Sequence, residues 1–340
     1  MFNPKYKISN RLLENIKRIA ALTAALNSGS FPRVVLVELE RAAREISSYS
    51  STSIEGNPLP LTEVKKILKN RPERLRDTEK EVINYNRALE SLNRSLGREK
   101  TCLNLGLLQI IQKQITSGLL DKSRCGQVRI EPVFVNNPLT RKTIYWPPDH
   151  LDVKPLLNDL FAFINQNRGQ IDPIILAGLF HKQLVVIHPF IDGNGRTARL
   201  ATKVILAKMG IDTFNLFSFE NYYNRNISKY FEQVGVLGNY YAIKNRIDFT
   251  AWLEYFTDGI IDELLRVQKE LLRSKISPEN ALLPHHQAML AYIKENGYIS
   301  DKIYSGLTRR AKATRNLDFN KLITLGLIKK YGQGKGTYYK

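Results

Sequence analysis

The chain has 340 residues, with 51 Lys plus Arg against 32 Asp plus Glu and a net charge of +19. This length allows two or three domains with an ample core, and the charge favours a polyanionic partner such as nucleic acid. Cys102 and Cys125 are too few for a disulfide framework, and no apolar run reaches transmembrane length, so we expect reduced thiols, no membrane contact and a cytoplasmic location.

Helical periodicity dominates up to residue 275 and is interrupted twice. The first interruption is the Ser/Thr-rich segment 47–60. The second is segment 126–148, where β-branched and aromatic residues, among them Ile130, Val133 and 143–146, surround an Asn-Asn-Pro turn. This pattern predicts a β-hairpin, and its prolines favour short edge strands. An ordinary connecting loop is the alternative.

A dense polar stretch, HPFIDGNGRTAR, follows an apolar run and spans residues 188–199. Gly193 and Gly195 allow a tight curl with backbone N–H groups aimed at one spot, and Asn194 tolerates left-handed conformations. Such a curl is an anion-binding nest. Apolar residues at helical spacing between Leu200 and Met209 predict that the nest opens a helix, whose N-terminal dipole also favours anions.

The charged side chains around the nest suit a polyphosphate. Arg196 and Arg199 lie one helical turn apart, and each guanidinium can bridge phosphate oxygens. Asp192 would repel a phosphate unless Mg²⁺ lay between them, so we interpret it as a metal ligand. His188 has an unperturbed pKa suited to proton abstraction near neutral pH. A structural histidine and a plain turn are the alternatives for each fragment alone, whereas their combination ahead of a helix favours a functional site.

The same stretch resembles the signature HPFx(D/E)GNGRxxR of the Fic family at every fixed position. Proteins similar to it transfer AMP from ATP to a Ser, Thr or Tyr hydroxyl of a target protein and release pyrophosphate. The resemblance implies that His188 deprotonates the hydroxyl and that Asp192 holds Mg²⁺ against the α and β phosphates. It also implies that the 193–195 backbone and Arg196 cradle those phosphates, while Arg199 binds the γ-phosphate.

The resemblance also assigns a function to segment 51–56, which the local sequence alone does not. It is similar to the (S/T)xxxE(G/N) motif of the helix that inhibits many Fic proteins, in the class where this helix precedes the signature. Ser51, Glu55 and Gly56 would then be the inhibitory residues, and Glu55 would restrain the enzyme by occupying Arg199.

Two further assignments follow from the resemblance. The hairpin would be the flap over the active site, which orients a target by pairing with its extended backbone, with Ile144 and Tyr145 in the flap. Tyr230 is similar to a position that lines the adenine pocket. The fold implied is mostly α, a Fic-type helical core with a short β-hairpin flap.

The last sixty residues form a different pattern. Helical segments at 284–297, 301–310 and 313–330 precede a glycine-rich hairpin at 331–340, which is the order of a winged helix-turn-helix domain. Residues 281–340 hold 11 Lys plus Arg and three Asp plus Glu, a net charge of +8, with Arg309, Arg310, Lys312 and Arg315 close together. A basic helix with a basic wing favours DNA, and protein contacts, including a homodimer, are the alternative.

The sequence therefore predicts an N-terminal helical region with the inhibitory motif at 1–110, a Fic core at 111–272 and a winged helix at 281–340, with a linker near 273–284. The leading function is a Mg²⁺- and ATP-dependent protein adenylyltransferase that modifies a target protein or itself. Two rivals stay open. One is a DNA-binding regulator whose core only senses nucleotide, and the other is an enzyme that removes AMP by hydrolysis, with Glu55 orienting the water.

Overall fold

The computed structural model describes residues 2–29, 31, 33–70, 72–96, 103–136, 140–207, 214–276 and 282–340. Cys102, Met209 and part of the predicted linker lie outside these residues, whereas Cys125 is buried with a free thiol. The chain forms two compact units, Met1–Gly29 with Ala42–Val267, and Ser30–Arg41 with Gln268–Lys340. Within the described ranges, no helix combines the length and the apolar character needed to cross a membrane.

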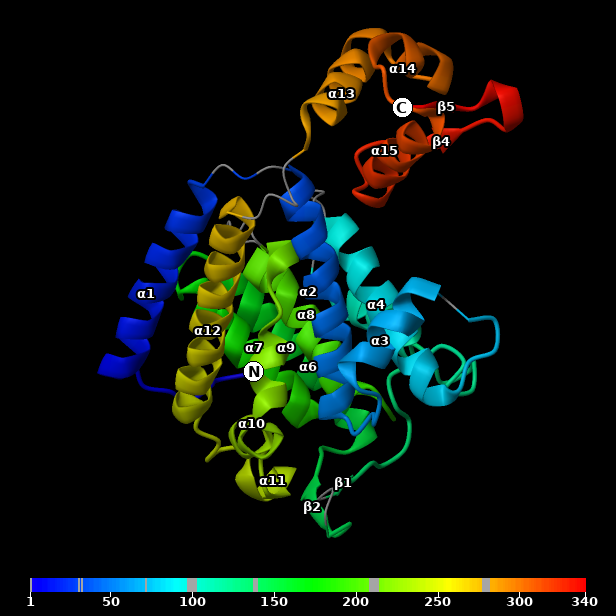
Figure 1. Cartoon of the computed structure of the whole chain (residues 1–340). Helices are drawn as coiled ribbons and strands as arrows, with labels where there is room; N and C mark the ends of the chain where they lie inside the picture. The colour runs from blue at the N-terminus through cyan, green and yellow to red at the C-terminus, as the bar shows by residue number, and fades with distance from the viewer. Residues whose placement is uncertain are drawn as a thin grey trace. The chain divides into compact units, whose positions relative to one another are not determined.

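The larger unit consists mainly of helices (Figure 1). In chain order its elements are α1 (Asn10–Asn27), the C-terminal part of α2 (Arg33–Ile54), α3 (Leu61–Asn70), α4 (Asp77–Leu96), α5 (Leu105–Ile115), β1 (Val135–Asn136), β2 (Thr143–Trp146), α6 (His150–Gln166), α7 (Pro173–Ile187), α8 (Asn194–Ala207), η1 (Phe214–Leu216), α9 (Phe219–Arg225), α10 (Ile227–Val234), β3 (Gly238–Asn239), α11 (Tyr240–Ile243) and most of α12 (Thr250–Ile276). Helix α12 runs through residues 273–276, which the sequence analysis assigned to the linker.

Helix α7 lies at the centre of the larger unit. Its residues from Ile174 to Ile187 are all buried except Val185, so it packs on every side. Trp252 of α12 donates its indole N–H to the Gly178 carbonyl oxygen at 2.8 Å. A Cβ at position 178 would lie 2.6 Å from Leu253, so glycine is needed for this close helix packing. The tight packing fixes the C-terminal end of α7, where the polar stretch begins.

Helix α2 corrects one prediction. The Ser/Thr-rich segment does not interrupt the helix at residue 47, because α2 continues to Ile54. The Ser48 hydroxyl donates to the Arg44 carbonyl and the Thr52 hydroxyl donates to the Ser48 carbonyl, both at 2.8 Å. These side chains therefore satisfy their hydrogen bonds inside the helix they were expected to break. Gly56, with φ of +93°, adopts a left-handed conformation just after the helix ends.

Strands β1 and β2 form an antiparallel hairpin, as predicted, with Val135 opposite Tyr145. The strands are shorter than the sequence pattern, and Ile130 and Val133 lie outside them. Strand β2 also pairs in parallel with β3, so it is the central strand of a three-stranded sheet. The prediction of two edge strands is wrong for β2, because the partner comes from a distant segment with no strand pattern of its own.

The smaller unit contains the predicted order of three helices and a hairpin. Its elements after α12 are α13 (Pro284–Asn296), α14 (Asp301–Leu307), α15 (Lys312–Thr324), β4 (Lys330–Tyr331), η3 (Gly334–Gly336) and β5 (Tyr338–Tyr339). Ile299 pairs with Tyr339 of β5, and Phe319 of α15 stacks on the Tyr339 ring at 4.0 Å. Helix α15 ends before the predicted residue 330, because Gly326 adopts φ of +67° just beyond the helix C-cap.

Candidate active site

The polar stretch forms the loop between α7 and α8. His188 follows the last residue of α7 with φ of 53° and ψ of 59°, a left-handed conformation that is uncommon for a residue with a side chain. Arg129 holds this turn. Its Nε donates to the His188 carbonyl oxygen at 2.8 Å, and its backbone N–H donates to the Pro189 carbonyl oxygen at 2.9 Å. Arg129 is not among the predicted site residues, since nothing in the sequence around it marks a functional role.

The imidazole of His188 is arranged as a base. Its Nδ1 lies 3.2 Å from the Val185 carbonyl oxygen, so a proton on Nδ1 leaves Nε2 as the basic nitrogen. Burial lowers the pKa of His188, and the Val185 carbonyl, Glu55 and Asp192 oppose that shift without cancelling it. The ring is therefore neutral at pH 7, as proton abstraction requires.

The nest is built around the start of α8. Gly193 has φ of +79°, and α8 begins at Asn194. The Asn194 side chain accepts from the Phe190 N–H at 2.9 Å and donates to the Phe190 carbonyl oxygen at 2.8 Å. Asn194 is helical, so the prediction of a left-handed backbone is wrong for it, and its side chain closes the curl instead. Gly195 provides space, because a Cβ there would overlap the Glu55 carboxylate.

Arg196 and Asp192 lie beside the nest. Arg196 donates from Nη1 to Glu81 at 2.8 Å and from Nη2 to Asp192 Oδ2 at 2.9 Å. The Gln112 amide donates to the Asp192 carbonyl oxygen at 3.1 Å and so fixes the loop. The Asp192 side chain is 48% exposed and, among the described residues, belongs to no ligand-spaced group of three. One accessible carboxylate fits Mg²⁺, which takes most of its ligands from water and substrate phosphates.

Arg199 is completely buried and engages the predicted inhibitory motif. Its Nε donates to Ser51 Oγ at 2.8 Å, and its Nη2 donates to the Ser51 carbonyl oxygen at 2.9 Å and to Glu55 Oε1 at 2.7 Å. Burial disfavours the charge of Arg199, but Tyr230 and Glu55 outweigh it and raise the pKa above its ordinary value. The structure thus brings Ser51 and Glu55 to the arginine predicted to bind a γ-phosphate.

Tyr230 also lies at Arg199. Arg199 Nη1 donates to the Tyr230 hydroxyl at 3.3 Å, and the same hydroxyl lies 3.2 Å from Nε2 of His181. The Tyr230 ring stacks on Tyr223 with 4.6 Å between ring centroids. Burial, aided by Arg199, lowers the pKa of His181 well below its usual value, so this histidine is neutral and structural.

This geometry agrees with comparisons to known proteins. Residues 102–206 match the sequence model of the Fic/DOC family. The chain carries a Fic/DOC domain. The predicted fold class, a mostly α-helical Fic-type core, is confirmed.

Curated relatives are named protein adenylyltransferase Fic. The chain is 28% identical to the one from Aedes aegypti over 201 residues, which cover 58% of this chain and 39% of the relative. It is 30% identical to the one from Drosophila yakuba over 179 residues, which cover 51% and 34%. The chain thus spans well under half the length of these relatives.

Solved structures share the fold. A Fic family protein from Desulfovibrio desulfuricans G20 aligns with a TM-score of 0.65 at 19% identity and covers 100% of this chain and 98% of its own. Fic-1 from C. elegans aligns with a TM-score of 0.61 at 23% identity and covers 77% and 73%. At these identities the likeness shows the fold alone.

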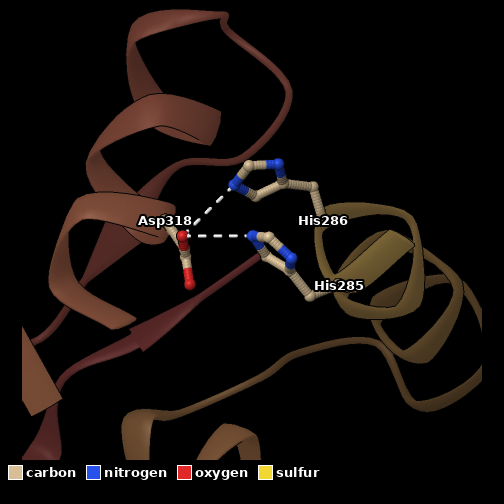
Figure 2. A group of neighbouring side chains, drawn as sticks. All are labelled: His285, His286 and Asp318. Atoms are coloured by element: carbon tan, nitrogen blue, oxygen red, sulfur yellow. Dashed lines mark ion pairs between the residues drawn. The ribbon is translucent and has the colours of Figure 1, made fainter. Parts of the chain in front are cut away.

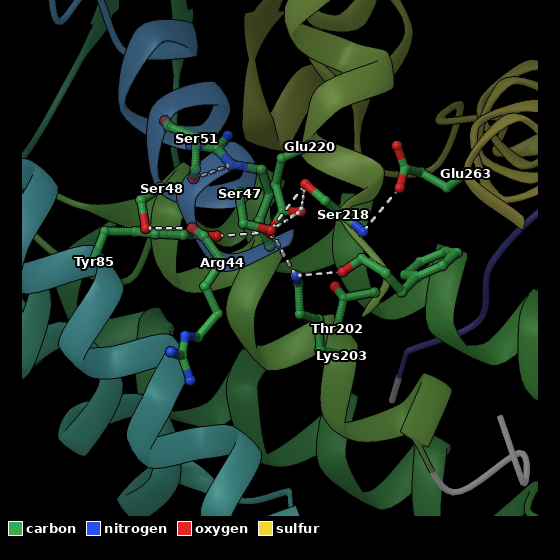
Figure 3. A network of polar contacts seen from close by, with 12 residues as sticks. Arg44, Ser47, Ser48, Ser51, Tyr85, Thr202, Lys203, Ser218, Glu220 and Glu263 are labelled. Carbon is green, nitrogen blue, oxygen red and sulfur yellow. Dashed lines mark hydrogen bonds and ion pairs between the residues drawn. The ribbon is translucent and has the colours of Figure 1, made fainter. Parts of the chain in front are cut away.

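A buried polar network holds α2 against the Fic domain (Figure 3). Lys203 of α8 and Glu220 of α9 form an ion pair at 3.1 Å with 1% and 0% of their side chains exposed. Ser47 of α2 donates to Glu220 at 3.1 Å, and Tyr85 of α4 donates to it at 2.7 Å. Polar bonds of Ser47 and Ser51 therefore hold this face of α2. Sequence reasoning missed this network, because its members are far apart in the chain.

The two residues predicted to lie in a flap, Ile144 and Tyr145, have different surroundings. The Tyr145 ring is buried, and its hydroxyl donates to the Val186 carbonyl oxygen at 2.8 Å, so this side chain anchors the hairpin to α7. The backbone of Ile144 belongs to β2, which lies between β1 and β3. In the described sheet, β1 and β3 are the edges. Ile130 and Phe134, just before β1, are exposed apolar side chains.

Proposed function

We propose that this protein is a Mg²⁺- and ATP-dependent protein adenylyltransferase, which transfers AMP to a Ser, Thr or Tyr hydroxyl of a target protein or of the chain itself. The observation that carries the proposal is the grouping of a neutral His188, the half-exposed Asp192 and the N-terminal nest of α8 on one short loop. A base, a metal ligand and a phosphate cradle are the groups that transfer from a nucleoside triphosphate requires. The names of the curated relatives agree with this reading.

In the proposed reaction, Nε2 of His188 accepts the proton of the target hydroxyl. The hydroxyl oxygen then bonds to the α-phosphorus of ATP, and the bond to the β-phosphate oxygen breaks to release pyrophosphate. The N–H groups of 193–195 and the Arg196 guanidinium would hold the phosphates and neutralise the developing charge. Bound Mg²⁺, held by Asp192, would supply further charge neutralisation.

Glu55 would restrain this reaction. Its carboxylate bonds to Arg199 at 2.7 Å and also covers the position where a Cβ of Gly195 would lie, so it occupies space next to the nest. ATP could still bind through the nest and Arg196, but its triphosphate would settle with the α-phosphorus misaligned for in-line attack. Misalignment of this kind lowers the rate more than the affinity.

The catalytic assignment is tested by His188→Ala. Nucleotide binding should stay nearly intact, while AMP transfer from labelled ATP should fall by roughly 10² to 10⁴, the usual contribution of a general base. His150→Ala, which removes a partly exposed histidine at the first position of α6, is the matched control and should keep the parental rate. Transfer by His188→Ala at the parental rate would show that the assignment is wrong.

The hydrolytic rival is tested with the same preparations. A target already modified with AMP is incubated with the parent, with Glu55→Gly and with His188→Ala. If Glu55 orients an attacking water, the parent releases AMP and both variants lose the release. If Glu55 only restrains transfer, neither the parent nor Glu55→Gly releases AMP from the modified target.

We also propose that residues 282–340 form a winged helix that binds duplex DNA. The order of helices and hairpin and the net charge of +8 over 281–340 support this. Lys312, the first residue of α15, and Arg309, between α14 and α15, are exposed. Arg315 and Arg310 support it less, because they pair with Asp301 at 2.7 Å and Asp318 at 2.8 Å.

Counterion release gives a quantitative test of DNA binding. The affinity of the full chain for random duplex should fall steeply with salt, and replacing Arg309 and Lys312 together by Ala should reduce the slope of log K against log salt by about 2. Lys69→Ala on α3 is the control and should leave the slope unchanged. If the full chain binds no duplex DNA even at low salt, the DNA-binding proposal is wrong and the protein-contact alternative remains.

A further inference from the structure

Two histidines and an aspartate meet in the core of the smaller unit (Figure 2). His285 and His286 lie in the first turn of α13, and Asp318 lies in α15. Nε2 of His285 is 3.4 Å from Asp318 Oδ1, and Nε2 of His286 is 3.3 Å from the same oxygen. One donor atom from each residue lies within 4.8 Å of the other two.

These separations match ligands that share an ion. Charge-assisted hydrogen bonds are usually about 2.7–2.9 Å long. Nitrogen and oxygen ligands at about 2.0–2.1 Å from a tetrahedral Zn²⁺ stand roughly 3.3–3.4 Å from each other. Both imidazoles therefore approach one carboxylate oxygen at the edge length of a zinc tetrahedron.

The hydrogen bonding of the histidines supports the same reading. His286 is 2% exposed, and within the described part of the chain neither of its ring nitrogens makes a well-aligned hydrogen bond. The same holds for Nε2 of His285. Buried polar atoms without partners are rare in native proteins and call for a ligand.

Asp318 is held in place by other groups. Tyr304 donates to Oδ2 at 2.8 Å, and Arg310 donates to Oδ2 at 2.8 Å and to Oδ1 at 3.1 Å. A carboxylate has about four acceptor sites, so one site remains on Oδ1, the oxygen that faces the histidines. Hydrogen bonds of this kind orient ligating carboxylates. A set of two imidazole nitrogens and one carboxylate disfavours hard cations such as Mg²⁺ and Ca²⁺, which prefer several oxygen ligands.

We propose that His285, His286 and Asp318 bind one divalent transition-metal ion of the Zn²⁺ class. Two imidazoles and a carboxylate are a common set of three zinc ligands, and they leave a fourth position for water. His285, with 18% of its side chain exposed, provides the side open to solvent. The ion ties the first turn of α13 to α15, so metal binding stabilises the smaller unit.

The test uses the full chain, stripped with EDTA and titrated with Zn²⁺ in competition with a chromophoric chelator. We expect uptake of one equivalent, and with Co²⁺ as the probe we expect the intense visible absorption of a tetrahedral site. His285→Ala and His286→Gln should each raise the Zn²⁺ dissociation constant by at least about tenfold. His150→Ala is the matched control, because His150 lies 3.2 Å from Asp149 without a second imidazole beside it, and it should bind as the parent does.

Several results would overturn the proposal. These are no stoichiometric Zn²⁺ uptake by the parent, parental affinity in both histidine variants, or an equal loss in His150→Ala. If His286→Gln fails to fold by circular dichroism, the partly exposed His285→Ala decides, because its side chain contributes less to the core.

Discussion

The contact between Glu55 and Arg199 makes a quantitative prediction about restraint of the Fic domain. Glu55→Gly removes the acceptor that lies 2.7 Å from Arg199 Nη2 and clears the carboxylate from Gly195. A hydrogen bond to a charged group contributes about 1.5–3 kcal/mol net. At 1.4 kcal/mol for each factor of ten, this corresponds to a roughly tenfold to hundredfold increase in the population in which Arg199 is free to bind ATP. The lower end applies if solvent weakens the bond, since the Glu55 side chain is 28% exposed.

The assay is incorporation of α-labelled AMP with Mg²⁺ and ATP, measured on samples shown to be folded. Glu55→Gly should raise the rate by about that factor while ATP affinity changes much less, because misalignment affects rate more than binding. Glu55→Gln should give a smaller rise, since it removes the charge and keeps an acceptor. Glu63→Gln, on the neighbouring helix α3, is the matched control and should behave as the parent.

Two outcomes would refute this reasoning. The first is equal incorporation by the parent and Glu55→Gly. The second is a full gain that persists when Arg199→Ala is added to Glu55→Gly, because the gain should depend on the released guanidinium.

Three further predictions concern buried groups. Because burial lowers the pKa of His188, the transfer rate should rise with pH through a value below about 6.5 and be flat above pH 7, and an inflection above pH 7 in the pH–rate profile would contradict this. His181 stays unprotonated in the folded protein, so the free energy of unfolding should fall as the pH falls below about 6.5, by up to about 1.4 kcal/mol per pH unit. Urea unfolding should show that this free energy depends less on pH in His181→Gln than in the parent. Breaking the buried ion pair by Lys203→Met should lower the free energy of unfolding in urea by about 3–5 kcal/mol. Replacing Lys203 and Glu220 together by Met and Leu should lower it by less, and equal losses would argue against a coupled pair.

The nest could be predicted from sequence because its geometry is local. Gly193, Gly195 and the helix that follows lie within one short stretch, and glycine conformation and helix polarity act over a few residues. The same reasoning failed for Asn194, whose side chain bonds to Phe190 rather than allowing a left-handed backbone. Both readings of asparagine are common in tight loops, and only the position of Phe190 decides between them.

Contacts between distant segments could not be predicted from local patterns. Glu55 and Arg199 are 144 positions apart, and their pairing was expected only through the family resemblance. Arg129 and Glu220 carry no local signal, since each acts through backbone or side-chain groups from distant segments of the chain. The parallel pairing of β2 with β3 is of the same kind, because a two-residue strand has no recognisable periodicity.

The central claim is that His188 directs transfer of the AMP portion of ATP, and the fate of two labels tests it most directly. Glu55→Gly is incubated with Mg²⁺ and ATP labelled at either the α- or the γ-phosphorus, alongside Glu55→Gly with His188→Ala. The account predicts that protein retains the α label and not the γ label, and that the added His188→Ala lowers retention by roughly 10² or more. Retention of the γ label, or undiminished α label without His188, would contradict it.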